Sequence, residues 1–228
     1  AAAAGAGEVP GATAASGVGG TADGAGEKLP AWRTRAQLLR IPGVKAVLVS
    51  FFCYSAFEAT CGNWAATFCT LARGIDAQTA ASWAALFYMG ITAGRAVSGF
   101  ISLKVNDRNM IRLGQALIAV ALVCVLMPGD SALFAGLVLL GCGCAPIYPS
   151  TIHATPARFG EELALELTGM QMAFAYIGSL AMSPLFGVFA QFFGTWLYPW
   201  YLEVFLVGMT VAGERLNRAM RVRERARA

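Results

Sequence analysis

The chain contains six apolar stretches, each separated from the next by a short group of polar, glycine or proline residues. They cover about residues 44–69, 80–103, 110–128, 131–152, 164–191 and 196–213. A helix needs about 20 apolar residues to cross the hydrocarbon core of a bilayer. The pattern therefore predicts six transmembrane helices, of which the last is the shortest.

The composition argues against a soluble globular protein. Hydrophobic residues make up 57% of the chain and charged residues 13%, and the mean hydropathy is +0.59. A chain of 228 residues cannot bury this much apolar surface in a single core. Lipid is therefore the expected solvent. The formal charge of +4 is spread over the ends of the apolar stretches, which does not indicate a nucleic-acid partner.

The pattern divides the chain into three regions. Ala, Gly, Thr and Ser dominate its start, which predicts a flexible cytoplasmic linker at 1–40. Residues 41–214 are expected to form the six-helix transmembrane domain, and 215–228 a basic cytoplasmic tail. The chain begins with Ala1 and its start has no charged segment followed by an apolar one, so no signal peptide is expected there. A linker in this position suggests that another segment precedes it.

Lysine and arginine residues gather in alternate connections. They lie before the first stretch and after the second, fourth and sixth, whereas the other connections carry only Arg73, with Asp76 and Asp130. Cytoplasmic loops of membrane proteins carry an excess of Lys and Arg. We therefore expect both termini in the cytoplasm and a multi-pass protein of the cell inner (plasma) membrane.

The fourth stretch ends in an unusual way. Gly141 and Gly143 are followed by Pro146 and Pro149, and each of these residue types weakens or interrupts helical hydrogen bonding. Within a membrane bundle such a break is tolerated where neighbouring helices or a wet cavity satisfy the freed backbone groups. Broken helices of this kind often border the binding site of a secondary transporter.

Three motifs together resemble a known family. Six spans that follow a polar cytoplasmic segment resemble the carboxy-terminal half of a major facilitator superfamily transporter. The run Gly94–Gly99, followed by Asp107 and Arg108, resembles a degenerate form of the superfamily's glycine–arginine loop signature. Joined to the run Ala145–Gly160, it resembles the fucose permease-like branch of sugar–proton symporters.

The resemblance implies a fold and a mode of action. The fold would be an all-α membrane protein of six transmembrane helices, built as two inverted three-helix repeats and forming one half of a twelve-span transporter. The implied activity is alternating access with a sugar as solute and protons as the coupling ion. The partner would be the missing amino-terminal six-span half, in which this family commonly carries its proton-coupling carboxylates.

Glu58 is the most costly residue in the chain. It lies near the middle of the first stretch, where an insertion scale assigns a charged side chain about 2.5–3.5 kcal/mol. Helical spacing places it on one face with Ser50 and Tyr54, which predicts a polar stripe facing a wet cavity. Trp64 would then stack on a sugar ring. The alternative is a structural hydrogen bond between helices from a protonated Glu58.

Four further polar side chains are candidates for binding the solute. Gln171 and Tyr176 in the fifth stretch offer donors and acceptors suited to hydroxyl groups. The alternative for both is bonding between helices. Tyr88 in the second stretch and Tyr148 beside the broken helix are weaker candidates of the same kind.

Four residues near the cytoplasmic ends are candidates for gating or structural roles. Arg95 can extend to the interface or hold a loop, and this role is favoured over contact with the solute. Asp107 and Arg108 belong to the loop signature. His153, the single histidine, is expected to make a structural loop contact rather than relay protons.

No cofactor or metal site is expected, and the protein is not expected to be an enzyme. The six cysteines all lie in or beside apolar stretches, and the Cys142-Gly-Cys144 spacing is not that of a zinc or redox motif. No catalytic pairing such as His-Glu-x-x-His occurs at membrane depth. Two alternatives to a sugar symporter stay open: a drug or metabolite exporter of the same superfamily, and a six-span scaffold without transport.

Overall fold

The computed structural model describes residues 37–225 of the chain. Most of the expected linker at 1–40 and the end of the expected tail at 215–228 lie outside the described residues. The described part is helical throughout and contains no strand. Its elements are α2 (Val44–Arg73), α3 (Ala77–Ile101), α4 (Asp107–Leu126), α5 (Asp130–Cys144), α6 (Ile147–Phe159), α7 (Glu161–Phe193), the short 3-10 helix η1 (Thr195–Leu197) and α8 (Tyr198–Arg225).

The expectation of an all-helical membrane fold is confirmed. Five helical segments are long and apolar enough to cross a bilayer: α2, α3, α4, the α5–α6 segment and α7. The sixth expected span lies in α8. Its apolar part, Tyr198–Gly213, contains Glu203 and is followed at once by Glu214 and Arg215, so it does not meet the same criterion. The helix nevertheless packs along α2 and continues to Arg225, beyond the expected end of the transmembrane domain at 214.

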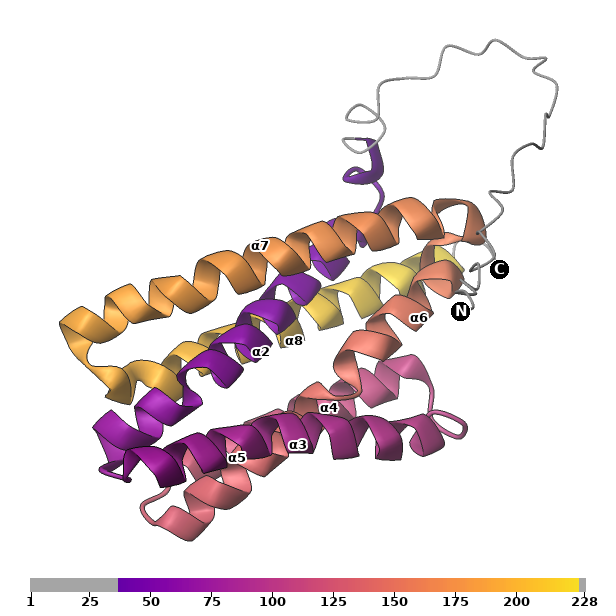
Figure 1. Cartoon of the computed structure of the whole chain (residues 1–228). Helices are drawn as coiled ribbons and strands as arrows, with labels where there is room; N and C mark the ends of the chain where they lie inside the picture. The colour runs from indigo at the N-terminus through magenta and orange to yellow at the C-terminus, as the bar shows by residue number, and fades with distance from the viewer. Residues whose placement is uncertain (1–36, 226–228) are drawn as a thin grey trace, which may run out of the picture.

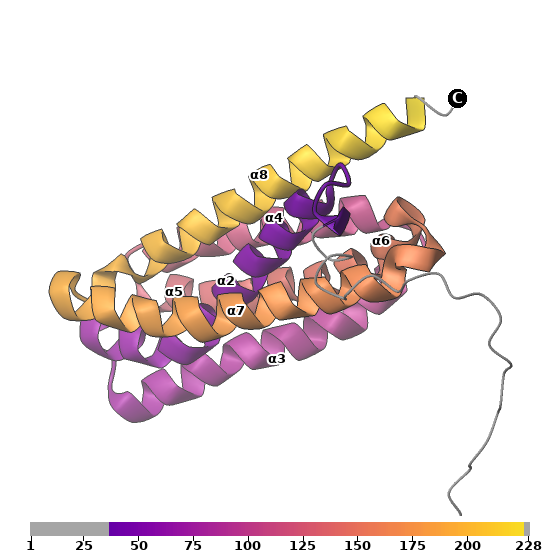
Figure 2. The same cartoon turned by 90° about the horizontal axis from the view of Figure 1, so that it is seen from above.

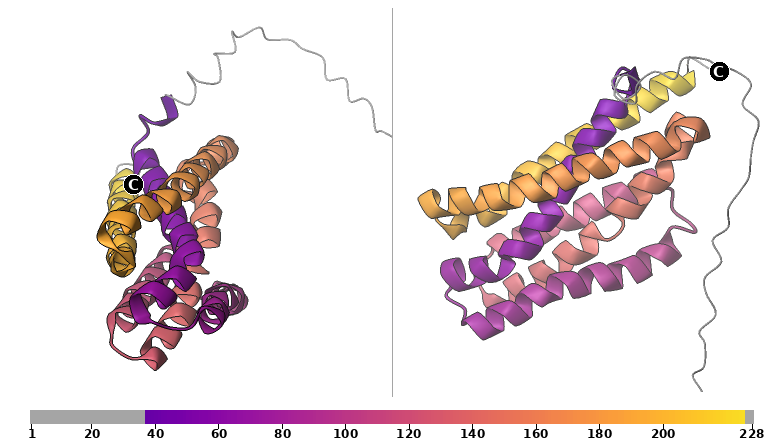
Figure 3. Two further views of the ribbon diagram at one scale, coloured as in Figure 1. Left: turned by 60° about the vertical axis from the view of Figure 1, so that its left-hand side comes forward. Right: turned by 45° about the horizontal axis from the view of Figure 1, so that its top comes forward.

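The helices pair in a pattern that repeats with reversed roles. The first helix of the first unit, α2, packs on α7 and α8, which are the second and third helices of the other unit. The first helix of that other unit, α5, packs in the same way on α3 and α4. Figure 3 shows α2 inclined across the bundle, between α7 and α8 on one side and α3 on the other. This exchange agrees with two inverted three-helix repeats.

The break in the fourth stretch occurs at the predicted place. Helix α5 ends at Cys144, and α6 begins at Ile147 after Ala145 and Pro146. Pro149 lies in the first turn of α6, where its missing N–H group would have no helical partner in any case. The Ser150 N–H group donates to the Pro146 carbonyl at 3.2 Å, so the chain turns without leaving the bundle.

Glycine residues allow the helices to approach closely where they cross. A methyl group added at Gly178 of α7 would lie 2.5 Å from the Phe52 carbonyl oxygen of α2. One added at Gly143 of α5 would lie 2.9 Å from the Gly114 carbonyl oxygen of α4. Small residues at such contacts are typical of helix packing in membranes, where close backbone approach replaces hydrophobic driving force.

Two tyrosines connect helices inside the core. The buried Tyr54 hydroxyl of α2 donates to the Cys144 carbonyl at the end of α5, at 3.2 Å. The buried Tyr198 hydroxyl of α8 donates to the Cys61 carbonyl of α2, at 3.1 Å. Both hydroxyls therefore satisfy main-chain oxygens where the described helices meet, at depths where water cannot do so.

Candidate functional site

The bundle has two unlike sides. Helices α3 and α7 lie toward one side and α8 toward the opposite side, with α2 between them (Figures 1 and 2). Glu58 of α2 is partly exposed and lies one helical turn from Gly62, which the Tyr88 hydroxyl of α3 contacts. Arg95 lies two turns beyond Tyr88 on the same face of α3. A carboxylate, a phenol and a guanidinium therefore lie along the boundary between α2 and α3.

The expected polar stripe on α2 is mostly closed. The Ser50 hydroxyl donates to the Met209 carbonyl at 3.3 Å, so it faces α8. Tyr54 is only 1% exposed and bonds to α5. Ser50 and Glu58 are both partly exposed, whereas Tyr54 is closed off in the core.

Tyr88 is the α3 residue that extends this cluster. Its side chain is exposed, and its hydroxyl rests on Gly62 of α2, where an added methyl group would collide with it. The ring packs edge-on against Phe87, with 5.3 Å between the ring centroids. Gly62 therefore gives Tyr88 its place close to Glu58.

Trp64 lies apart from this cluster. Its indole N–H group donates to the Ser183 carbonyl of α7 at 2.9 Å, and its ring packs edge-on against Phe186 at 5.2 Å between centroids. It is six residues from Glu58 along α2, which corresponds to about 9 Å of helix rise. The described contacts of Trp64 are therefore those of a residue that packs α2 against α7.

The two candidates on α7 lie on different faces. Gln171 is fully buried and its amide nitrogen donates to the Thr155 hydroxyl of α6 at 3.0 Å, which is the interhelical bond that sequence analysis gave as the alternative. Tyr176 is exposed. Tyr148 of α6 is partly buried. Its hydroxyl donates to the Met172 sulfur at 3.1 Å, and its ring packs against Phe51.

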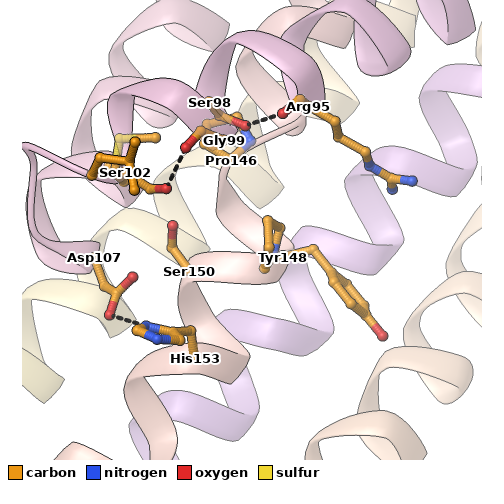
Figure 4. Close-up of a pocket in the computed structure, with 12 residues that line it drawn as sticks. Arg95, Ser98, Gly99, Ser102, Asp107, Pro146, Tyr148, Ser150 and His153 are labelled. Atoms are coloured by element: carbon orange, nitrogen blue, oxygen red, sulfur yellow. Dashed lines mark hydrogen bonds and ion pairs between the residues drawn. The ribbon is translucent and has the colours of Figure 1, made fainter.

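A cavity opens beside the carboxy-terminal part of α3 and the first turns of α6. Its volume is about 690 Å³, and Arg95, Tyr148 and His153 are among the residues that line it. Figure 4 shows Arg95 and Tyr148 extending to one side of it and the Asp107–His153 pair at the other. Arg95 therefore belongs both to the cavity and to the cluster around Glu58.

Asp107 and His153, two of the residues expected to have gating or structural roles, meet at one edge of this cavity. His153 Nδ1 lies 2.8 Å from a carboxylate oxygen of Asp107 and joins α6 to the start of α4. Arg108 does not line the cavity. Its positive charge acts on the guanidinium of Arg158, near the end of α6. The contact between Asp107 and His153 links the start of α4 to α6, and the structural role of His153 stays a prediction.

Sequence analysis missed the serines of the cavity. Ser98 and Ser102 follow Arg95 along α3 at spacings of three and four, so they share its face, and this spacing was a signal that could have been used. Ser150 also lines the cavity from α6. Its position depends on how the broken helix turns, which the spacing does not reveal.

The family model of the Major Facilitator Superfamily matches residues 46–224. The chain belongs to the Major Facilitator Superfamily. The match covers every helix from α2 to α8, and the superfamily consists of transporters that pass the membrane several times. No curated protein matches the chain significantly in sequence.

Solved structures of this superfamily share the fold. The chain is similar to the Escherichia coli fucose:proton symporter, with a TM-score of 0.67 and 15% identity over 82% of this chain and 45% of the symporter. The same symporter in its outward conformation gives a TM-score of 0.64 and 15% identity over 82% and 44%. The POT family transporter PepTSo gives 0.66 and 18% identity over 78% and 37%. The chain therefore spans less than half the length of these transporters.

Proposed function

We propose that this superfamily member forms one six-helix half of a twelve-span transporter that moves a small polar solute, a sugar, by proton-coupled alternating access. The observation that carries the proposal is the placement of Glu58, Tyr88 and Arg95 along the boundary between α2 and α3, with Arg95 lining a cavity. Charged residues in membrane helices are costly and mark solute pathways when they face a cavity rather than lipid. The likeness to a fucose:proton symporter supports the choice of a sugar and of protons.

The second half is the partner that this arrangement requires. Helices α3 and α7 carry exposed polar side chains, including Tyr88 and Tyr176. Lipid cannot satisfy such groups, whereas a second six-helix half would close the solute pathway over them. The amino-terminal half would also supply the coupling carboxylates, and the chain alone should not transport.

The test measures uptake by the complete transporter with Glu58 changed. Glu58→Gln keeps the shape and part of the hydrogen bonding, so we expect weaker sugar binding in a protein that still folds. Glu58→Ala should abolish uptake and leave membrane expression nearly unchanged, because a site built to bond hydroxyls loses heavily when one partner is removed. The matched control is Glu203→Gln, which changes a carboxylate in the groove between α4 and α8 and should leave uptake intact.

The opposite result would assign Glu58 a structural role. In that case Glu58→Ala would lower expression or thermal stability, and the protein that survives would bind sugar with normal affinity. A substrate panel that includes cationic aromatic compounds tests the exporter alternative in the same vesicles. Transport of those compounds without sugar uptake would replace the sugar proposal.

We propose that the protein lies in the cell inner (plasma) membrane with both termini in the cytoplasm. Labelling tests this orientation. Single cysteines are introduced at connections in a background without native cysteines. Asp76→Cys and Asp130→Cys should react with an impermeant reagent from outside. Asp107→Cys and Arg158→Cys should react only after the membrane is opened. Labelling of any one position from the other side would overturn this topology.

A further inference from the structure

Arg95 is a cation without a fixed counterion. It lies six residues before the end of α3, which places its Cα about 9 Å from that end. Within residues 37–225, neither of the two ion pairs involves its guanidinium, and no hydrogen bond from it is present. Glu58 lies beyond ion-pair distance. The side chain is exposed and lines the cavity, so an anion bound there would contact the guanidinium of Arg95 directly.

The other charges of the cavity already balance each other. Asp107 and His153 form a pair at one edge, at 2.8 Å. Ser98 and Ser102 donate their hydroxyl hydrogens to carbonyls of their own helix, at 3.1 Å and 2.8 Å. The positive charge of Arg95 is therefore the part of the described lining that a ligand can still neutralise.

The cavity also offers hydrogen bonds away from Arg95. Ser150 is 95% buried, since its exposed fraction is 5%, and its hydroxyl makes no hydrogen bond within the described residues. Figure 4 shows this hydroxyl between Ser102 and the Asp107–His153 pair, while Arg95 and Tyr148 extend to the opposite side. A ligand that fills the cavity would therefore meet a cation at one end and hydroxyl groups at the other.

We propose that the cavity binds a small hydroxylated carboxylic acid, with the carboxylate on Arg95 and the hydroxyl groups toward Ser150 and His153. The planar guanidinium suits the two oxygens of a carboxylate. A doubly charged phosphate fits less well, because the single guanidinium of Arg95 would leave part of its negative charge unbalanced. The volume of about 690 Å³ is in the range of small-molecule sites. The inference rests on the proposed function and narrows its solute from a neutral sugar to a sugar acid.

The experiment compares acids with neutral molecules of the same carbon chain. The probes are D-gluconate against D-glucitol, glycerate against glycerol and lactate against propane-1,2-diol, at constant ionic strength, with inorganic phosphate as a further anion. Thermal unfolding of the purified protein in lipid nanodiscs is followed as each probe is titrated. We expect saturable stabilisation by at least one acid, with a half-saturating concentration at least tenfold below that of its neutral match.

The variants decide whether Arg95 carries this preference. Arg95→Gln should raise the half-saturating acid concentration at least tenfold, and Arg95→Lys should retain part of the binding because it keeps the charge. Lys104→Gln removes a neighbouring positive charge outside the cavity and should change nothing. If Arg95→Gln alone unfolds, the Arg95→Lys titration still tests the site, because loss of the bidentate contact must weaken acid binding at least threefold.

Several results would overturn the proposal. They are stabilisation by no acid, equal stabilisation by acid and neutral match, tighter binding of phosphate, and undiminished acid binding in the Arg95 variants. Neutral sugar uptake by the complete transporter in any of these cases would leave the proposed function standing. Acid binding at Arg95 without transport of any sugar or sugar acid would support the acid site and refute the proposed transport function.

Discussion

Helices α3 and α5 touch through glycine, and this contact gives a sharp test of the fold. A methyl group added at Gly141 of α5 would overlap the Phe87 carbonyl oxygen of α3 and lie 2.8 Å from the Ile91 nitrogen. On α3, a methyl group at Gly90 would lie 3.1 Å from the Gly141 Cα atom. Gly90 lies in the middle of α3 and Gly141 in the last turn of α5, so both backbones are held in helical conformation at the contact.

The expected cost of Gly141→Ala follows from this geometry. Ordinary contact needs roughly 3.4 Å, so even the Ile91 nitrogen lies about 0.6 Å too close, and the two helices must separate along their crossing. Overpacking of this kind costs about 1–3 kcal/mol. Alanine has a higher helix propensity than glycine, which stabilises the helix by up to about 1 kcal/mol. The net loss in the free energy of unfolding should therefore be about 1–2 kcal/mol.

The matched control is Gly169→Ala in α7, where an added methyl group has no atom within 4 Å among the described residues. Here only the propensity gain applies, so stability should rise by up to about 1 kcal/mol. The assay is thermal unfolding of both variants in the same detergent, and the melting temperatures should differ by roughly 5–10 °C. Equal melting temperatures, or a more stable Gly141→Ala protein, would refute the close crossing of α3 and α5.

Three further predictions concern polar groups outside the candidate site. Arg73→Gln should lower stability by about 1–2 kcal/mol in the same unfolding assay, since the guanidinium donates to the Met127 carbonyl at 2.7 Å at the end of α4, and Arg73→Lys should recover part of the loss. Gln115→Leu should raise stability by about 1 kcal/mol, because its buried amide nitrogen has no hydrogen-bond partner within the described residues. Hydrogen bonds from Thr79 and Gln78 lower the pKa of Asp76, so its contribution is present above the unfolded-state pKa of about 3.9 and is lost as the pH falls toward the folded-state value. Asp76→Asn should remove this part of the acid-induced loss of melting temperature.

The spans and their ends could be predicted from the sequence. The thickness of the bilayer sets the length of an apolar stretch, and glycine, proline and capping residues act within one or two turns, so these features are local. The break near Pro146 and the order of the helices followed from such signals. The charged residues of α8 make its membrane span hard to recognise from composition, although the helix continues through them without a break.

Accessibility could not be predicted, because it depends on which helix lies opposite. The run Trp196–Tyr201 contains four aromatic residues, and the sequence does not distinguish their surroundings. Trp196 and Trp200 are exposed, whereas Tyr198 is fully buried against α2. Gln171 and Tyr176 are five residues apart on one helix, and α6 covers only the first. Helical spacing determines which residues share a face, and that much is in the sequence. The crossing of distant segments through glycine contacts determines which face meets a neighbour, and only the tertiary structure contains it.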